Sequence, residues 1–415
     1  MMTGPARGCD RISHQYYKHD YLARRKRLLP WLAAYLVLGS AEVSASTRTR
    51  VDSYINQILE LVVAHRRGTT RLGQPAELTA RSIITGGAFF LAGNDGWVAE
   101  GTGRAGGLIG VQPLTSIDLT RKGDVVWLSY SSNTYGAQSR AGRVLEDRGC
   151  LVIAFGPRPE NNPPEFKHWV DSFTPWTGDE HLTLMGNVLS LWTLTAEVVA
   201  STARQGKTLA FWESFSIEGA KQRDDLYKGT MFHDGIPRIT PVPPDTLPRA
   251  YLDYIENVIR GIQRHELKKI LATGEEMTRR AAESRPVILM LIGHMMLSVV
   301  SRDGKLFRYF DLTANRSDVD NLVGSDGYFI LLGYVAVPLD VWRGVRRAGA
   351  RGVWIVSALP TEVDFTQFGD LVIDQHWQVG DCAVEVPGYD IRLFPPSGIA
   401  QLLIYELLLR SAVNE

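Results

Sequence analysis

Short, uninterrupted apolar runs alternate with longer stretches of helical period over most of the chain. In the first half of the chain, the runs that predict strands are Ser82–Leu91, Val125–Ser129, Leu151–Phe155 and Trp169–Phe173. In the second half they are Val287–Ile292, Tyr328–Leu332, Val353–Val356 and Leu371–Ile373. A run that is apolar at every position is typical of a strand buried on both faces of a parallel sheet. The pattern therefore predicts an α/β fold built from doubly wound, flavodoxin-like parallel sheets with helices on both sides.

The length of the chain, 415 residues, exceeds what one hydrophobic core usually holds, so two domains are expected. The segment 235–248 carries five prolines and predicts a linker rather than a helix. We therefore expect a first domain at residues 46–234 and a second at residues 249–415. These two segments are called the first half and the second half below.

The two halves resemble each other at a steady offset of about 200 residues. Tyr54-Ile55-x-x-Ile58-Leu59 recurs as Tyr254-Ile255-x-x-Val258-Ile259, and Arg148-Gly149-Cys150-Leu151 recurs as Arg351-Gly352-Val353-Trp354. Asp171 followed by Gly178-Asp179 recurs as Asp374 followed by Gly380-Asp381. The matches keep their order along the chain, which predicts an internal repeat of one α/β unit.

A hydroxyl-rich turn, Ser129-Tyr130-Ser131-Ser132-Asn133-Thr134, follows the buried run Val125–Leu128 and precedes a stretch of helical period. In open parallel sheets ligands bind at the carboxyl ends of the strands, where a loop leads into the next helix. The backbone N–H groups of a helix N-terminus are unpaired, and the helix dipole there favours an anion. One hydroxyl would suffice to cap the helix, so the run of polar side chains favours a phosphate site over capping alone.

These residues resemble the SIS (sugar isomerase) domain family, whose members carry Ser-x-Ser-Gly-x-Thr after a strand that begins Gly-Asp-Val-Val. The chain has Gly123-Asp124-Val125-Val126 before the turn, and Ser132 stands where the pattern has Gly. Gly93-Asn94-Asp95-Gly96 is similar to the Gly-Asn-Gly-Gly loop of phosphoheptose isomerases, with Trp97 in place of the usual Ser. Further similar stretches are Ala99-Glu100, Arg104–Leu108, Asp370–Asp374, Gly380–Glu385 and Pro395-Pro396-Ser397.

The resemblance implies tandem SIS domains and a sugar phosphate or related small carbohydrate as ligand. It also implies that paired domains pack together, each site being built partly from its neighbour, so a homo-oligomer is possible. The expected substrate-binding residues are Asn94, Asp95, Ser129, Ser131, Ser132, Asn133 and Thr134.

At an offset of 203 the hydroxyl-rich turn aligns with the apolar segment Leu332–Pro338 of the second half. An apolar lining cannot offset the desolvation of a phosphate dianion. We therefore expect the second half to be degenerate as a binding site and to complete the site of the first half.

Aldose–ketose isomerisation needs a side chain that moves a proton next to a carbonyl. Glu100 is the first candidate for the base, because it follows the first strand, although a glutamate in the first turn of a helix also suits the dipole. His294 lies at the corresponding strand end of the second half and could act across the domain interface, although a single His is more often structural. His181, after Gly178-Asp179-Glu180, is a third candidate.

Composition narrows the range of partners. Lys plus Arg and Asp plus Glu both number 45, so no global charge favours nucleic acid. The three cysteines form no CxxC or Cys/His cluster, so no metal site is expected, and no cofactor is predicted.

The N-terminus has the features of an export signal. Arg24-Arg25-Lys26-Arg27 precedes the apolar stretch Leu28–Gly39, which is too short to span a bilayer, and Val43-x-Ala45 provides small residues for cleavage. The paired arginines resemble a twin-arginine signal. Residues 1–45 are thus predicted to be a signal peptide, or an N-terminal extension if the protein remains cytoplasmic, and no stable membrane span is expected.

Two functions remain open from the sequence. The first is a sugar phosphate isomerase that acts through an enediol. The second is a carbohydrate-binding or sensing protein that has kept the site without the chemistry, a possibility that export would favour.

Overall fold

The computed structural model describes residues 45–160, 165–233, 239–300, 306–310, 319–359, 363–365, 369–378 and 380–412. The predicted signal peptide therefore lies outside the described residues, apart from Ala45, where helix α2 begins. Part of the predicted linker, residues 235–238, is also outside them.

The strands of the first half are β1 (Phe89–Ala92), β2 (Val111–Pro113), β3 (Val125–Ser129), β4 (Leu151–Gly156) and β5 (Trp169–Asp171). Those of the second half are β6 (Val287–Leu291), β7 (Arg308–Phe310), β8 (Tyr328–Leu332), β9 (Arg351–Val356), β10 (Leu371–Asp374), β11 (Val384–Glu385) and β12 (Arg392–Leu393). The α-helices of the first half are α2 (Ala45–Gly68), α3 (Gly73–Ile84), α4 (Asp95–Gly101), α5 (Tyr135–Asp147), α6 (Glu180–Arg204) and α7 (Ala220–Tyr227). Those of the second half are α8 (Thr246–Gly261), α9 (Leu267–Ala282), α10 (Met296–Val299), α12 (Val319–Val323), α13 (Leu339–Ala348) and α14 (Ser397–Ala412).

Each half contains one parallel five-stranded sheet, and the two sheets have the same topology. The order is β2-β1-β3-β4-β5 in the first and, read from the corresponding edge, β7-β6-β8-β9-β10 in the second. The predicted α/β class of doubly wound parallel sheets is confirmed.

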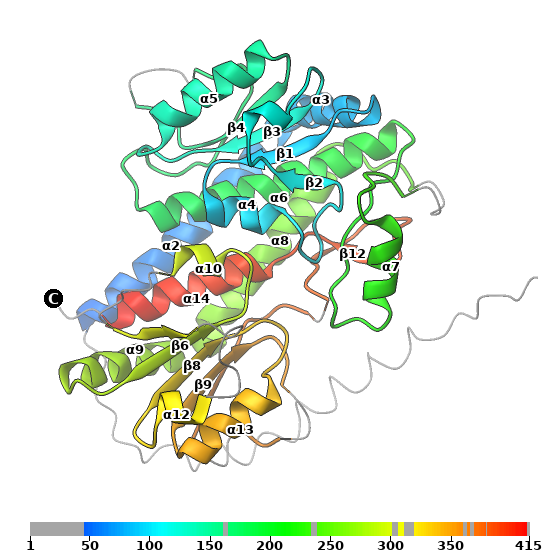
Figure 1. The fold of residues 1–415 in the computed structure, drawn as a ribbon. Coiled ribbons are helices and arrows are strands. Elements are labelled where there is room, and N and C mark those ends of the chain that lie inside the picture. The colour runs from blue at the N-terminus through cyan, green and yellow to red at the C-terminus, as the bar shows by residue number, and fades with distance from the viewer. Residues whose placement is uncertain are drawn as a thin grey trace, which may run out of the picture. The chain divides into compact units, whose positions relative to one another are not determined.

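A layer of helices separates the two sheets, as Figure 1 shows. Helix α6 packs against α3 and α8, while α14 packs against α9 and α2. Helix α5 covers the outer face of the first sheet, and α12 and α13 cover the outer face of the second. The middle layer thus belongs to both halves, and residues of one half can reach the strand ends of the other.

Helix α6 is the one helix in the described part of the chain that is long and apolar enough to cross a membrane. Its apolar window is entirely buried inside the fold. Its composition is therefore that of a central core helix.

One predicted strand, Ser82–Leu91, begins too early. Residues up to Ile84 belong to α3, because Ala76, Ala80 and Ile83 recur at helical spacing and are buried together. The chain then turns at Gly86, which has φ +94°, and the strand begins at Phe89. Helix α8 likewise starts at Thr246, inside the expected linker, because Pro248 is tolerated in the first turn of a helix.

The loop after the last paired strand of each sheet has the same local geometry. Asp171 accepts a hydrogen bond from the backbone N–H of Phe173 at 2.8 Å, and Asp374 accepts one from that of His376 at 2.7 Å. Phe173 and His376 both have positive φ, 56° and 59°. The two halves therefore share this turn, although the aspartate is the only residue of the turn that their sequences have in common.

Candidate functional site

The hydroxyl-rich turn lies at the carboxyl end of β3, as predicted, and leads into α5. The backbone N–H of Ser131 donates to Thr134 Oγ1 at 2.9 Å, and the N–H of Thr134 donates to the carbonyl of Ser131 at 3.2 Å. Thr134 therefore closes the turn and makes no side-chain capping bond to α5. Local side-chain to backbone bonds of this kind are what Ser and Thr favour in turns.

Ser129 and Asn94 join the ends of the neighbouring strands β1 and β3. Ser129 Oγ is fully buried and accepts a hydrogen bond from the backbone N–H of Asn94 at 3.0 Å. Asn94 Oδ1 in turn caps α4 by accepting from the N–H of Trp97 at 3.1 Å. Gly93, with φ +111°, lies so close to the Ser129 backbone that a side chain would not fit there. These two predicted ligand residues thus shape the site.

Ser131 and Asn133 point their donors at one oxygen atom. Ser131 Oγ lies 3.1 Å from Glu180 Oε1, and Asn133 Nδ2 donates to the same oxygen at 2.6 Å. Glu180 is the first residue of α6 and is exposed to solvent. The turn therefore presents two converging hydrogen-bond donors to an anionic oxygen.

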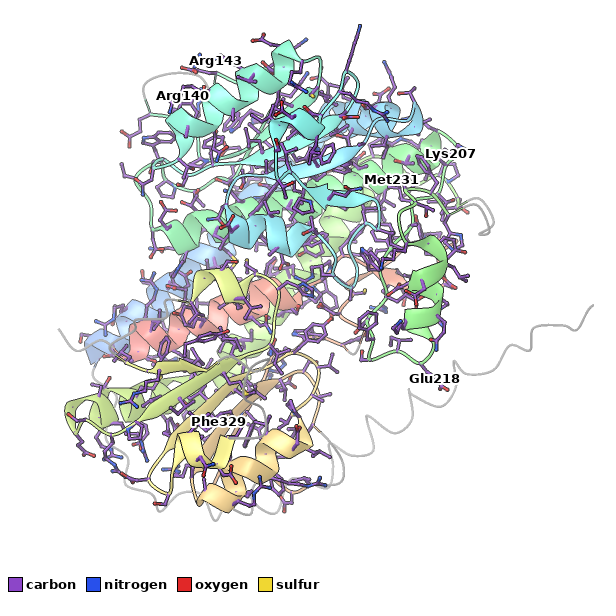
Figure 2. All side chains as sticks on the ribbon, viewed as in Figure 1. Arg140, Arg143, Lys207, Glu218, Met231 and Phe329 are labelled. Carbon is purple, nitrogen blue, oxygen red and sulfur yellow. The ribbon has the colours of Figure 1, made fainter. Side chains whose placement is uncertain are left out.

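Of the other predicted ligand residues, Ser132 is half-buried in the turn and Asp95 is exposed in the first turn of α4. The arginines on α5 do not add positive charge to the turn. Arg140 and Arg143 lie on the outer surface of that helix (Figure 2), and Arg143 pairs with Glu165 at 3.1 Å. The donors of this site are thus neutral hydroxyl, amide and backbone groups.

His181, the residue after Glu180, bonds to the second half. Its Nδ1 lies 2.5 Å from Oε1 of Glu406, a residue of α14 that is almost fully buried. The second oxygen of Glu406 pairs with Arg410 at 3.0 Å, and Arg410 also contacts Asp179 at 2.8 Å. The hydrogen bond to Glu406 raises the pKa of His181, which favours the imidazolium form. His181 is partly exposed, so one titratable ring stands beside the turn, held by both halves.

Glu100, predicted as the base, lies in a buried ion-pair network instead of an open site. Its side chain has no exposed surface; it pairs with Arg104 and accepts a hydrogen bond from Trp192 Nε1 at 3.2 Å. Nη2 of Arg104 also donates to two residues of the second half, Asp381 Oδ2 and Ser397 Oγ, each at 2.6 Å. We call Glu100, Arg104, Asp381 and Ser397 the buried network. A carboxylate held in this way cannot touch a ligand in the hydroxyl-rich turn without a rearrangement of the core.

His294 lies where the second half approaches α4. The next residue, Met295, packs against Gly96 in the first turn of that helix. The His294 side chain reaches solvent, yet desolvation by the surrounding protein and the charge of Arg104 lower its pKa. Its ring makes no hydrogen bond within the described part of the chain. The structure thus places His294 on the α4 side of the site, as a neutral imidazole at pH 7.

The equivalent turn of the second half is closed by its own side chains. The carbonyl of Gly333, just after β8, accepts hydrogen bonds from Gln375 Nε2 at 2.7 Å and from Gln401 Nε2 at 2.5 Å. The Tyr334 hydroxyl donates a hydrogen bond to Asp381 Oδ2 at 2.8 Å. Among the described residues, the turn at Gly333 therefore lacks converging side-chain donors like those of Ser131 and Asn133 in the first half.

Glu180 and Glu406 were not identified by the sequence analysis. One signal pointed to Glu180: it follows the repeated Gly-Asp pair in the first half, where the second half has Cys382. An acidic residue thus accompanies the hydroxyl-rich turn only where that turn is present. Nothing in the sequence pairs Glu406 with His181, because 225 residues separate them.

No protein-family model and no curated protein sequence matches the chain significantly. Among solved structures, a protein from Salmonella typhimurium LT2 assigned as sugar binding matches with a TM-score of 0.50 at 11% identity. The match covers 87% of this chain and 98% of that one. The chain has an SIS-type fold.

Two further solved structures of low similarity cover most of this chain. The C-terminal domain of a glucosamine-fructose-6-phosphate aminotransferase from Francisella tularensis gives a TM-score of 0.48 at 9% identity, covering 91% of this chain and 99% of that one. A protein from Silicibacter pomeroyi DSS-3 assigned as a phosphosugar isomerase gives 0.46 at 12% identity, covering 88% and 96%. The doubly wound parallel fold implied by the sequence resemblance is confirmed.

Proposed function

We propose that the chain binds a phosphorylated sugar, with the phosphate in the hydroxyl-rich turn after β3. One observation carries the proposal: the side chains of Ser131 and Asn133 converge on a single anionic oxygen. The N-terminus of α5 adds the favourable end of a helix dipole next to the same turn. The second half, which has the same topology, lacks these donors, so the fold itself does not require them.

Removing the donors should weaken phosphate binding in particular. A hydrogen bond to a charged group contributes about 1.5–3 kcal/mol, so a Ser131→Ala/Asn133→Ala variant should bind at least about tenfold more weakly. The measurement is a thermal shift with fructose 6-phosphate and with fructose, in both proteins. Thr85→Ala is the matched control. Its exposed hydroxyl donates to the carbonyl of Arg81, in the last turn of α3, and Thr85 precedes β1, so it lies near the amino ends of the strands rather than the carboxyl ends. Equal stabilisation of the three proteins by the sugar phosphate would refute the assignment.

We further propose that the bound sugar is isomerised between aldose and ketose through an enediol. His181 takes the proton from the carbon next to the carbonyl and returns a proton to the former carbonyl carbon, while water exchanges protons with the two oxygen atoms. Glu406 holds Nδ1, which leaves Nε2 for a ligand. The raised pKa makes the neutral ring a stronger base, and the imidazolium formed holds the proton until one is returned to carbon. The buried Glu100 is proposed to orient Arg104 rather than to take a proton from carbon.

Solvent deuterium incorporation, followed by NMR, tests the isomerase. Fructose 6-phosphate incubated with the protein in D2O should exchange the hydrogen on carbon next to the carbonyl. His181→Asn should lose most of this exchange while keeping phosphate binding, whereas His294→Asn reports separately on the other predicted histidine. If both variants exchange at the wild-type rate, neither ring takes part.

A second function, non-catalytic binding of a carbohydrate derivative, is supported by the burial of Glu100, the carboxylate first expected to act as the base, in an ion pair with Arg104. Tight binding of fructose 6-phosphate without any exchange in the wild-type protein would support this alternative.

A further inference from the structure

Glu180 occupies the anion position of the hydroxyl-rich turn. Its Oε1 takes the side-chain donors of both Ser131 and Asn133, which are two of the residues predicted to hold phosphate. Within the described part of the chain, no Lys or Arg lies in ion-pair distance of Glu180. The carboxylate is exposed, so its side chain can rotate towards solvent without disturbing the core.

We propose that Glu180 is a resident anion that a ligand's phosphate must displace, and that it thereby sets the charge specificity of the turn. This inference rests on the proposed phosphate-binding function. The Ser131 hydroxyl has a single hydrogen, so it cannot donate to Glu180 and to a phosphate at the same time, although the Asn133 amide has a second hydrogen. The negative charges of Glu180 and the phosphate would also repel each other a few ångströms apart.

The competition favours one class of ligand. A sugar acid carries a single carboxylate, which offers the turn no more than Glu180 already provides from within the chain. A phosphate ester carries a charge of about −1.5 to −2 and three acceptor oxygens, so it can use the backbone N–H groups of α5 as well. Glu180 therefore excludes monoanionic sugars and admits phosphorylated ones at reduced affinity.

Calorimetric titration of the full chain with inorganic phosphate, fructose 6-phosphate and glucuronate tests the proposal. Glu180→Ala removes the competing acceptor, and Glu180→Gln removes only its charge. Both variants should bind phosphate and fructose 6-phosphate about tenfold more tightly than wild type, with Ala at least equal to Gln. Glucuronate should bind to Glu180→Ala and not measurably to wild type.

Glu218→Gln is the matched control, because this exposed glutamate lies beside α7, away from the turn (Figure 2). It should leave the affinity for every probe within twofold of wild type. Weaker phosphate binding by the Glu180 variants would overturn the proposal, since Glu180 would then contact the ligand instead of competing with it.

The resident contact can also be tested without ligand. Ser131→Ala, Glu180→Ala and the double variant form a thermodynamic cycle in which unfolding is measured in phosphate-free buffer. A favourable coupling between the two positions is expected, whereas additive effects would show that the contact is not made. If wild type binds sugar phosphate but Glu180→Ala binds no tighter, this inference fails alone; if neither protein binds it, the phosphate-binding function fails.

Discussion

Arg104 connects the two halves through the buried network, and replacing it with Met leaves two carboxylates buried without a counter-charge. The Arg104 side chain is 2% exposed, and those of Glu100 and Asp381 have no exposed surface. Removing one partner from a buried ion pair costs about 3–5 kcal/mol, because the remaining charge stays desolvated. Met retains much of the apolar stem, so this loss arises mainly from charge. Against a typical total stability of about 5–15 kcal/mol, the variant should be severely destabilised.

Urea unfolding at pH 7 measures the effect as a change in the free energy of unfolding. Arg81→Met is the control: it removes a surface pair with Glu77, in which both side chains are more than half exposed, and should cost less than about 1 kcal/mol. Arg104→Met/Glu100→Gln/Asp381→Asn should recover most of the lost stability, because neutral replacements remove the uncompensated charges. A loss below about 1 kcal/mol in Arg104→Met, or no recovery in the triple variant, would refute the reasoning.

The pH dependence of the same variant provides an independent check. Burial raises the pKa values of Glu100 and Asp381, and the charge of Arg104 partly opposes this rise. An acid whose folded pKa exceeds its unfolded pKa binds more protons when folded, so stability falls as pH rises through that interval. Without Arg104 the interval widens, so the deficit of Arg104→Met should shrink on acidification from pH 7 to pH 5.

The remaining predictions concern substitutions at single positions. His181→Gln should be destabilised most below pH 6.5, because the raised pKa of His181 gives a stabilisation that is complete below the unfolded value and lost as pH rises through the folded one. His294→Gln should show the opposite trend, since a lowered pKa makes the native His294 costly to protonate; thermal unfolding between pH 5 and 9 compares the two. Gly398→Ala should cost about 1–3 kcal/mol, because a methyl group there would collide with the Glu100 carboxylate that Arg104 holds in place. Gly73→Ala, with open space around it, should be neutral or stabilising by the same assay.

Apolar runs identified most of the central strands because burial on both faces leaves a strand no polar positions. Val125–Ser129 and Tyr328–Leu332 were predicted with their observed ends. The short edge strands β2 and β7 were not predicted, because each has only three residues and β2 is mostly exposed. The early start predicted for the first strand shows the same limit: Ile83 and Ile84 are apolar and β-branched, yet helical burial with Ala76 and Ala80 decides their conformation.

The sequence located the turn of the candidate site but not its partners. A strand end followed by hydroxyls is a local pattern, whereas the pairing of His181 with Glu406 depends on how α6 and α14 pack in three dimensions. Glu100 shows the converse problem. Its position after the first strand suited a base, but Arg104, one helical turn later, and Asp381, far along the chain, turn it into a buried ion.

In the second half, the helix that closes the apolar turn also provides a residue to the candidate site of the first half. Gln401, which closes the Gly333 turn, lies on α14, and so does Glu406, which holds His181 beside the turn of the first half. Helix α14 packs in the layer between the two sheets (Figure 1). It therefore contacts the strand ends of the second sheet through Gln401 and His181 of the first half through Glu406. A second ligand at Gly333 would have to displace Gln401, and any shift of α14 would also move Glu406 away from His181. The geometry therefore favours one site of the proposed kind for each chain, built from the strands of the first half and helix α14 of the second.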